Sequence, residues 1–252
     1  MSLLELKEVT VSFAFPDGRP ALLALNQVNL SVAQGELVAL VGPSGCGKTT
    51  ALNVLAGQVV PTSGQVRLAG EPVQGILPSV GYISQADTLL PWRTVLDNVA
   101  LAMELRGVPK SQRQETARAL MKSMGLEGFE QSYPRELSGG QRQALTLLMA
   151  TLQNPRLLLL DEHTAALDPG TAEKVLRITR EVVAEHRITT LMVTHNMHQA
   201  LELGNRTLMM DSGNIILDVR GEERSGLTVS GLLERFRAGA GKNLDNDRIL
   251  LS

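Results

Sequence analysis

The chain has 252 residues, of which 43 % are hydrophobic and 20 % charged, so it can form one large α/β domain or two small ones and is not expected to be disordered. Its formal net charge of −2, without a basic stripe, argues against nucleic acid as a partner. The single cysteine, Cys46, excludes an intrachain disulfide, the first residues lack a signal-peptide pattern, and no uncharged apolar stretch reaches the about 18 residues of a membrane span, so we expect a soluble cytoplasmic polypeptide.

The first third of the chain predicts short strands. One of them, at residues 36–41, is uniformly apolar, which is typical of a strand buried on both faces. It leads directly into a glycine-rich loop and then into a helix that ends near Gly57. The predicted strands of this part are 3–11, 25–32, 36–41, 65–68 and 80–84.

The middle of the chain changes to a helical pattern. Apolar residues recur at helical spacing from 95 to 105 and again from 117 to 124, so residues 90–133 are predicted to be a helical insertion. Strands and helices alternate again after it. We expect strands at 157–160, 189–193, 206–210 and 215–219, and helices at 171–184, 197–203 and 229–236. This alternation predicts an α/β fold with a mostly parallel sheet covered on both faces, and a second, helical lobe.

The loop after the strand at 36–41 matches the phosphate-binding P-loop. Its glycines let backbone N–H groups close around phosphates, and the positive end of the next helix faces the same anion. Lys48 is expected to reach the β- and γ-phosphates, and the Thr49 hydroxyl to ligate Mg²⁺. The predicted nucleotide-binding residues here are Gly42, Pro43, Ser44, Gly45, Cys46, Gly47, Lys48, Thr49 and Thr50.

Two adjacent carboxylates, Asp161 and Glu162, follow four leucines at the end of a predicted buried strand. Open α/β sheets hold their ligands at this end of the strands. Neighbouring side chains of a regular strand point to opposite faces, so the two acids suit different tasks. We expect Asp161 to hold Mg²⁺ and Glu162 to orient and polarise the attacking water.

The segment Leu-Ser-Gly-Gly-Gln at 137–141 combines a good helix N-cap with two glycines. Placed before the acidic strand, it resembles the signature motif of the ABC ATPases, and other motifs of that family follow. Gln85 matches the Q-loop glutamine, residues 166–168 the D-loop, and His195 the switch histidine. The resemblance covers nearly the whole chain. It implies one ABC ATPase domain over 1–252: a P-loop NTPase core with an antiparallel β subdomain (1–89 and 134–220), a helical subdomain (90–133) and a tail (221–252).

The resemblance also implies roles for individual residues. In such proteins two nucleotide-binding domains pair head to tail, and the signature residues Ser138, Gly139, Gly140 and Gln141 of one cap the ATP on the P-loop of the other. His195 would contact the γ-phosphate and Asp168 would shape the dimer interface. Gln85 would sense Mg²⁺ or its water and connect to the helical subdomain. An aromatic residue before the P-loop would stack on adenine; Phe13 and Phe15 are the candidates, and distance from the P-loop favours Phe15.

The pattern departs from the family at several positions. His163 stands where proline is common, Ala165 where serine is common, and Met149 in place of a frequent arginine. None of these residues has a proposed catalytic role. Residues 42–50 and 87–93 resemble the nitrate, sulfonate and taurine importers, whereas 161–168 and 193–197 resemble a different importer branch, so the transported substrate is not assigned.

The sequence therefore predicts an ATP-hydrolysing transporter subunit, with ATP and Mg²⁺ as ligands, that works at the inner face of the cell membrane. The expected partners are a second copy or a related ATPase subunit, permease subunits on separate chains and, for import, a solute-binding protein. The alternatives are a non-transport ABC ATPase acting on ribosomes or DNA, an exporter motor, and a binding module without hydrolysis. The intact Lys48, Asp161, Glu162 and His195 argue against the last of these.

Overall fold

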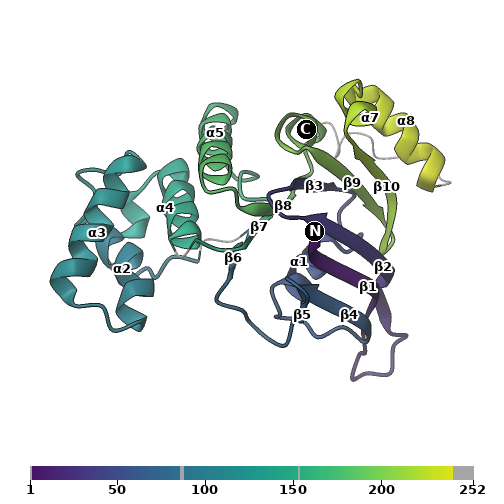
Figure 1. Cartoon of the computed structure of the whole chain (residues 1–252), viewed down its shortest axis with the longest axis horizontal. Helices are drawn as coiled ribbons and strands as arrows, with labels where there is room; N and C mark the ends of the chain where they lie inside the picture. Colours follow the sequence, from purple (N-terminus) through teal and green to yellow (C-terminus); the bar gives the residue numbers. More distant parts are fainter. Residues whose placement is uncertain (1, 86–87, 153, 241–252) are drawn as a thin grey trace. The chain divides into compact units, whose positions relative to one another are not determined.

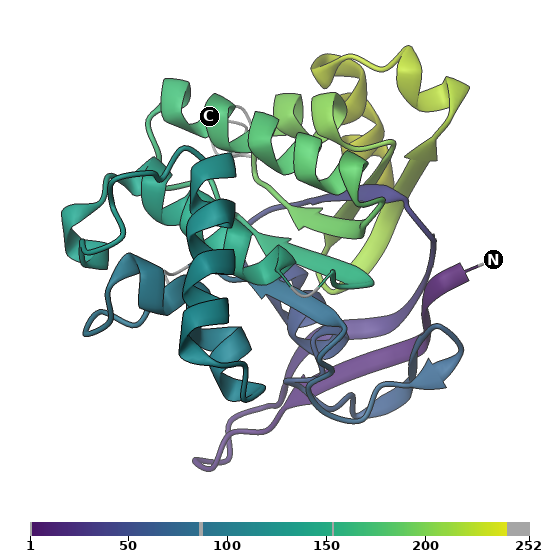
Figure 2. The same cartoon turned by 60° about the vertical axis from the view of Figure 1, so that its left-hand side comes forward.

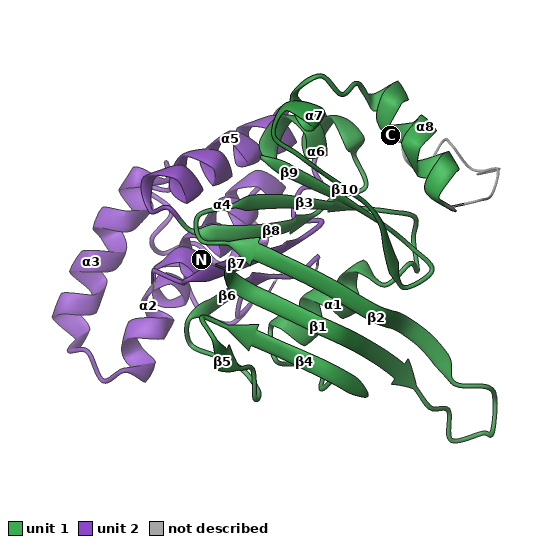
Figure 3. Ribbon diagram, turned by 45° about the vertical axis from the view of Figure 1, so that its right-hand side comes forward, with its two compact units in different colours: residues 1–80, 188–252 green, residues 81–187 purple. Residues whose placement is uncertain are grey.

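The computed structural model describes residues 2–85, 88–152 and 154–240 (Figure 1). Part of the 87–93 stretch and the last twelve residues of the tail lie outside this description. The chain divides into two units, one of residues 1–80 and 188–252 and the other of residues 81–187 (Figure 3).

An antiparallel sheet opens the first unit. Its strands lie in the order β2-β1-β4-β5, with β1 at Ser2–Phe13, β2 at Leu22–Ala33, β4 at Ser63–Leu68 and β5 at Glu71–Pro72. Alternate residues are apolar and buried, so Leu4 pairs with Leu68 and Leu6 with Val66 on one face. The connection between β1 and β2, in purple, projects beyond the end of the strands (Figure 2). This sheet confirms the predicted antiparallel β subdomain, although the short β5 was not predicted.

A second group of strands in the same unit is mostly parallel. β3 (Leu37–Val41) lies between β8 (Thr189–Val193) and β9 (Arg206–Asp211) and runs parallel to both, while β10 (Asn214–Arg220) pairs antiparallel with β9. All the apolar residues of β8 are buried, as expected for a central strand. The helices of this unit are α1 (Lys48–Leu55), α6 (Met197–Leu203), α7 (Glu222–Ser225) and α8 (Val229–Ala240).

Two arginines, Arg206 buried and Arg224 half-buried, join the C-terminal elements of this unit to the rest of it. Arg206, 5 % exposed, donates to both carboxylate oxygens of Asp218 at 2.7 and 2.6 Å and to the Ser31 carbonyl at 2.6 Å. Arg224 donates to the carbonyls of Ala200 and Leu201 at the end of α6. The predicted helix at 229–236 exists as α8 and buries Leu232 and Phe236 completely, so it is packed rather than a loose surface helix.

The second unit holds strands β6 (Val80–Ile83) and β7 (Leu157–Asp161), which are neighbours, and four α-helices. The predicted helical insertion contains α2 (Val95–Leu105) and α3 (Lys110–Ser123), which starts seven residues before its apolar pattern. After the short 3-10 turn Pro134–Glu136 come α4 (Gly139–Thr151) and α5 (Pro169–Glu185). α2, α3 and α4 share an apolar core that includes Val95, Val99, Met121 and Leu145. Among the described residues, no helix is both long and apolar enough to cross a bilayer.

Candidate functional site

The P-loop of the first unit connects β3 to α1, as predicted. Its shape depends on glycines at two close backbone approaches. A Cβ on Gly42 would lie 2.3 Å from the Met210 carbonyl oxygen, and one on Gly47 would lie 2.4 Å from the Ala24 carbonyl oxygen. Gly47 also has a φ of +108°, a left-handed conformation that other residues rarely adopt. The loop is therefore wedged between the start of β2 and the end of β9.

Lys48 begins α1 and is folded back onto the loop. Its ammonium donates to the carbonyls of Gly42 at 2.8 Å and Pro43 at 3.0 Å, and the residue is only 6 % exposed. No side chain caps this end of α1, because the N-cap position is a glycine. A helix start with uncapped N–H groups and a buried ammonium is a site for an anion such as a phosphate.

A hollow of about 240 Å³ adjoins this helix start. One wall is apolar and half exposed, formed by Phe13, Leu22 and Leu23, and the other is the P-loop. A ligand with a flat apolar part and a phosphate part would find both surfaces here. The lining residues are Phe13, Leu22, Leu23, Ala24, Gly45, Gly47, Lys48, Thr49 and Thr50.

The structure separates the two aromatic candidates. Phe13 lines the hollow, whereas the ring of Phe15 lies 4.4 Å from the guanidinium carbon of Arg19. The two rings do not share one face of a strand, because β1 ends at Phe13 and Phe15 is already in a turn closed by Gly18. Distance along the sequence favoured Phe15, but position in space favours Phe13.

Cys46 is buried within the P-loop, and burial raises the pKa of its thiol. Its backbone carbonyl accepts a hydrogen bond from Gly213 N–H at 3.0 Å, which ties the loop to the β9–β10 turn. A protonated, buried thiol in this setting acts as a small packing residue rather than a reactive group.

His195 follows β8 at the same edge of the strands as the P-loop. Thr194 N–H donates to the Leu40 carbonyl at 3.2 Å, two residues before the loop begins. Neighbouring polar residues fix the backbone on both sides of His195: Asn196 N–H donates to Thr194 Oγ1 at 3.1 Å, and Gln199 N–H donates to Asn196 Oδ1 at 3.0 Å. His195 itself is half-buried.

The second unit positions the two acids at the end of β7. Asp161, the last residue of the strand, is 4 % exposed, and Glu162 is half-buried with a left-handed φ of +48°. β7 ends at Asp161, and Glu162 begins the connection that leads to α5. Gln85 lies exposed just after β6.

Tyr82, on β6, is a partner of Asp161 that was missed by the sequence analysis. Burial, the Asp161 charge and a hydrogen bond to that carboxylate together raise the pKa of Tyr82 to about 12. The phenol therefore stays protonated and donates to the carboxylate. The sequence pattern of β6 does not distinguish Tyr82 from its neighbours, so its contact with Asp161 is found only in the three-dimensional structure.

The signature residues start α4 with a reciprocal cap. Gln141 N–H donates to Ser138 Oγ at 3.3 Å, and Ser138 N–H donates to Gln141 Oε1 at 2.9 Å. A Cβ on either glycine would also come close to a side chain of the segment that follows β7. A Cβ on Gly139 would lie 2.9 Å from Leu167 Cδ2, and one on Gly140 would lie 2.3 Å from Thr171 Cγ2. The signature glycines thus pack against the first turn of α5.

Asp168 caps that first turn of α5. Its Oδ1 accepts the Thr171 N–H at 3.0 Å, and hydrogen bonds from Thr171 lower the pKa of the carboxyl group. The predicted site residues therefore form two sets. Phe13, the P-loop and His195 belong to the first unit, and Gln85, the two acids, the signature motif and Asp168 to the second.

Within the described part of the chain, no group of three or more His, Cys, Asp or Glu side chains is arranged to hold a metal. So few protein donors fit Mg²⁺ better than a metal that is held entirely by protein ligands. Mg²⁺ usually takes one or two protein oxygens and fills its shell with water and substrate phosphates. Of the residues predicted to hold this ion, Thr49 offers a hydroxyl in the first unit and Asp161 a carboxylate oxygen in the second.

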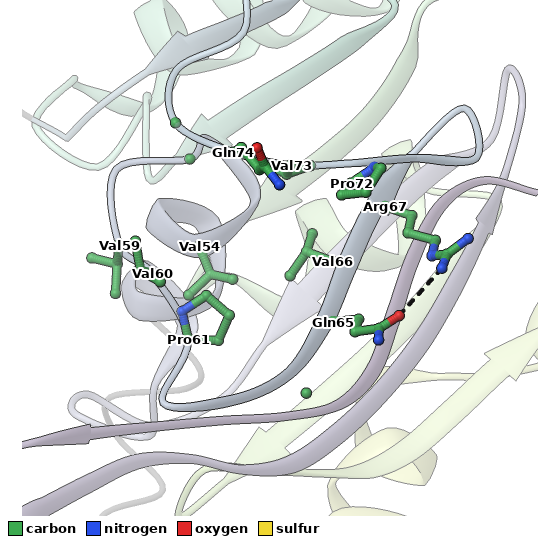
Figure 4. A pocket seen from close by; sticks show the side chains of 13 residues that line it. Val54, Val59, Val60, Pro61, Gln65, Val66, Arg67, Pro72, Val73 and Gln74 are labelled. Atoms are coloured by element: carbon green, nitrogen blue, oxygen red, sulfur yellow. Dashed lines mark hydrogen bonds between the residues drawn. The ribbon is translucent and has the colours of Figure 1, made fainter.

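A second, larger hollow of about 560 Å³ lies in the first unit beside the end of α1 and β4 (Figure 4). Its wall is mostly apolar, with Val54, Pro61 and Val66 among its residues, and its polar part includes Arg67, which donates to Gln65 Oε1 at 3.3 Å. It contains none of the predicted site residues. A large volume alone does not indicate a binding site. The lining residues favour the hollow beside the P-loop as the candidate functional site.

Comparisons with known proteins show the family of this chain. Residues 25–165 match the model of a family described as ABC transporter. The chain is 38 % identical over 248 residues to the tyrosine transport ATP-binding protein of Clostridioides difficile, covering 93 % of this chain and 98 % of that protein. It is 40 % identical over 206 residues to the taurine import ATP-binding protein of Escherichia coli, covering 82 % of this chain and 80 % of that protein.

Solved structures give the same family. A dimeric ATP-binding cassette in a post-hydrolysis state with ADP and Pi matches with a TM-score of 0.77 and 30 % identity. The match covers 86 % of this chain and 98 % of that one.

Burial of His163 predicts a pH dependence of stability. The residue is 3 % exposed, and burial lowers its pKa from 6.5 to about 4. The unfolded chain therefore binds more protons between these values, so the stabilisation is complete above about pH 6.5 and is lost as the pH falls towards 4. We expect the free energy of unfolding to be about 2 kcal/mol lower at pH 5 than at pH 7.5 because of this residue, as measured by urea denaturation at the two pH values.

The matched control for this measurement is His163→Gln. Other groups titrate equally in both proteins, so the difference between the two pH profiles isolates the histidine. Parallel profiles for wild type and variant would show that His163 is not held neutral.

Proposed function

Since this chain belongs to the ABC transporter family, we propose that it binds and hydrolyses ATP as the motor subunit of an importer whose membrane-spanning subunits are separate chains. The observation that carries the proposal is the hollow of the first unit. There an uncapped helix start and Lys48 adjoin an apolar wall. This combination suits a nucleotide, with its phosphates on the P-loop and its base against the wall.

The binding roles follow from the positions of the residues. Lys48 would exchange the carbonyls of Gly42 and Pro43 for the β- and γ-phosphate oxygens of ATP. Phe13 would stack on adenine, since it lines the hollow and Phe15 does not. Thr49 and Asp161 would hold Mg²⁺, with Gln85 beside its water shell. Bound Mg²⁺ would neutralise charge on the phosphates.

Hydrolysis needs a water aligned with the γ-phosphate. Glu162 would orient and polarise that water from its position just after the end of β7, where its backbone is left-handed. His195 would contact the γ-phosphate from the edge that carries the P-loop. Two fixed groups around one water reduce the entropy lost on reaching the transition state.

A second copy, or a related subunit, would complete each site. The helix start of α4 presents Ser138, Gly139, Gly140 and Gln141, and we propose that it caps the ATP bound to the partner. The dimeric cassettes among the matching structures support this arrangement. Asp168 would lie at the interface, because the turn that it caps packs against the signature glycines.

Coupling to transport is supported by the relatives. The tyrosine and taurine proteins are named as transport and import ATP-binding proteins. We propose that this chain likewise sits at the inner face of the cell membrane, bound to permease subunits and, through them, to a solute-binding protein. ATP-driven closing of the dimer would move the permeases between two access states.

The role of Glu162 is tested by Glu162→Gln. We expect ATP turnover to fall at least 100-fold because the water loses its polarising carboxylate, while ATP binding and closing of the dimer remain. Size-exclusion chromatography with ATP should then show a stable dimer, and without ATP it should not. A variant that hydrolyses ATP at the wild-type rate would remove Glu162 from the mechanism.

Replacing the two phenylalanines distinguishes the adenine platform. Phe13→Ala should weaken ATP binding by about tenfold, since stacking on a base contributes about 1–3 kcal/mol. Phe15→Ala, the matched control, should change the affinity less than twofold. Titration calorimetry with ATP in the absence of Mg²⁺ measures both, and the reverse ranking would place the base at Phe15.

Tyr82→Phe tests the support of Asp161. Loss of the hydroxyl that orients a metal-binding carboxylate should raise the Mg²⁺ concentration for half-maximal ATPase activity by about tenfold. Tyr133→Phe is the control, because Tyr133 lies on the surface near Arg135. Equal Mg²⁺ dependence in the two variants would show that Tyr82 does not act on the metal site.

Transport is tested by co-purification of the tagged protein from native membranes after mild cross-linking. Mass spectrometry should find a multi-span permease and a solute-binding protein. Recovery of ribosomal or DNA-associated proteins without a permease would leave the ATPase intact and overturn the transport function.

A further inference from the structure

We propose that His163 is a positioning residue for Glu162, acting through a buried hydrogen bond to Thr179 in the middle of α5. The inference rests on the proposed function, because it concerns the water-activating glutamate. His163 directly follows Glu162, and both partners of the hydrogen bond are buried, with 3 % of His163 and 2 % of Thr179 exposed.

The direction of the hydrogen bond is fixed by chemistry. His163 Nε2 lies 3.3 Å from Thr179 Oγ1, and Thr179 Oγ1 lies 2.9 Å from the Val175 carbonyl, to which it donates its only proton. The Thr179 hydroxyl can therefore only accept a hydrogen bond from His163. His163 is thus the neutral tautomer with its proton on Nε2, and it donates to Thr179.

Glu162 needs such a support. Its left-handed φ of +48° is uncommon for a residue with a long side chain, and it persists only where the surroundings determine it. On one side Glu162 is held by β7. On the other, its carbonyl accepts Ala165 N–H at 2.9 Å, which closes a single turn. The hydrogen bond of His163 adds an anchor to a long helix, immediately beside the strained residue.

The same helix carries other parts of the site. Its first turn is capped by Asp168, and Thr171 in that turn packs against Gly140 of the signature motif. The hydrogen bond between His163 and Thr179 therefore fixes Glu162 to the helix against which the signature motif packs. A glutamate held in this way keeps its place relative to the part of the chain that would contact the partner's nucleotide.

The test compares variants that remove the hydrogen bond with variants that keep it. His163→Leu and Thr179→Val remove it, whereas His163→Gln retains an N–H donor and Thr179→Ser retains the hydroxyl. We expect the first pair to lower kcat of ATP hydrolysis by about 10- to 100-fold with KM for ATP unchanged within about twofold. The second pair should recover most of the activity.

A double variant and a matched control separate positioning from loss of packing. His163→Leu with Thr179→Val should be no slower than either single variant, because both remove one interaction. Thr151→Val is the control. Thr151 is also a buried threonine whose hydroxyl donates within its own helix, to Leu147 at 2.8 Å, and its loss should leave kcat unchanged.

ATP-dependent dimer formation separates a positioning role from a merely structural one, because a general loss of structure would reduce it. In a Glu162→Gln background, His163→Leu should leave ATP-dependent dimer formation unchanged. A wild-type kcat in folded Thr179→Val protein would overturn the inference. Loss of ATP-dependent dimers when His163→Leu is added to Glu162→Gln would also overturn it. If Glu162→Gln alone keeps full turnover, the proposed role of Glu162 fails instead, and the two failures remain distinguishable.

Discussion

The shape of the P-loop depends on two places where backbone presses against backbone. Carbonyl oxygens of Met210 and Ala24 occupy the space that side chains would need at Gly42 and Gly47. This contact places the start of α1, without a side-chain cap, at the edge of β3 and beside Phe13. The anion site, the position of Lys48 and the apolar wall for a base all follow from this constraint.

The second unit also has glycines at the start of a helix, where another segment lies close to them. Gly139 and Gly140 are small because α5 lies against them, and α5 in turn is capped by Asp168 and joined to His163 through Thr179. One helix thus organises the signature motif and the segment that carries Glu162. Under the proposed function, the chemistry would depend on two helix starts, one that holds the phosphates of the chain's own nucleotide and one that caps those of a partner.

Much of this could be predicted from the sequence, because the decisive signals are local. The P-loop spacing, two acids after four leucines and a serine before two glycines each combine a motif with the strand or helix that it needs. The helical pattern of residues 95–105 likewise matches α2 residue for residue. Short elements such as β5 and α7 were not predicted, since a strand of two residues and a helix of four show no periodicity.

Contacts between distant residues could not be predicted. Tyr82 meets Asp161, and His163 meets Thr179, only after the strands and α5 have packed, and neither pair shares a sequence pattern. The different surroundings of Phe13 and Phe15 have a related cause. Spacing of two implies one strand face, but β1 ends at Phe13, so the chain direction changes before Phe15.

The most direct test of a shared nucleotide site is complementation between two inactive variants. Lys48→Ala should abolish nucleotide binding on its own P-loop, and Ser138→Arg should block the cap on the partner's nucleotide. Mixed one to one, they should recover up to about a quarter of wild-type ATPase activity, since half of randomly formed dimers are mixed and each then has one intact site. A mixture that stays inactive, although the mixed dimer forms, would contradict the head-to-tail site.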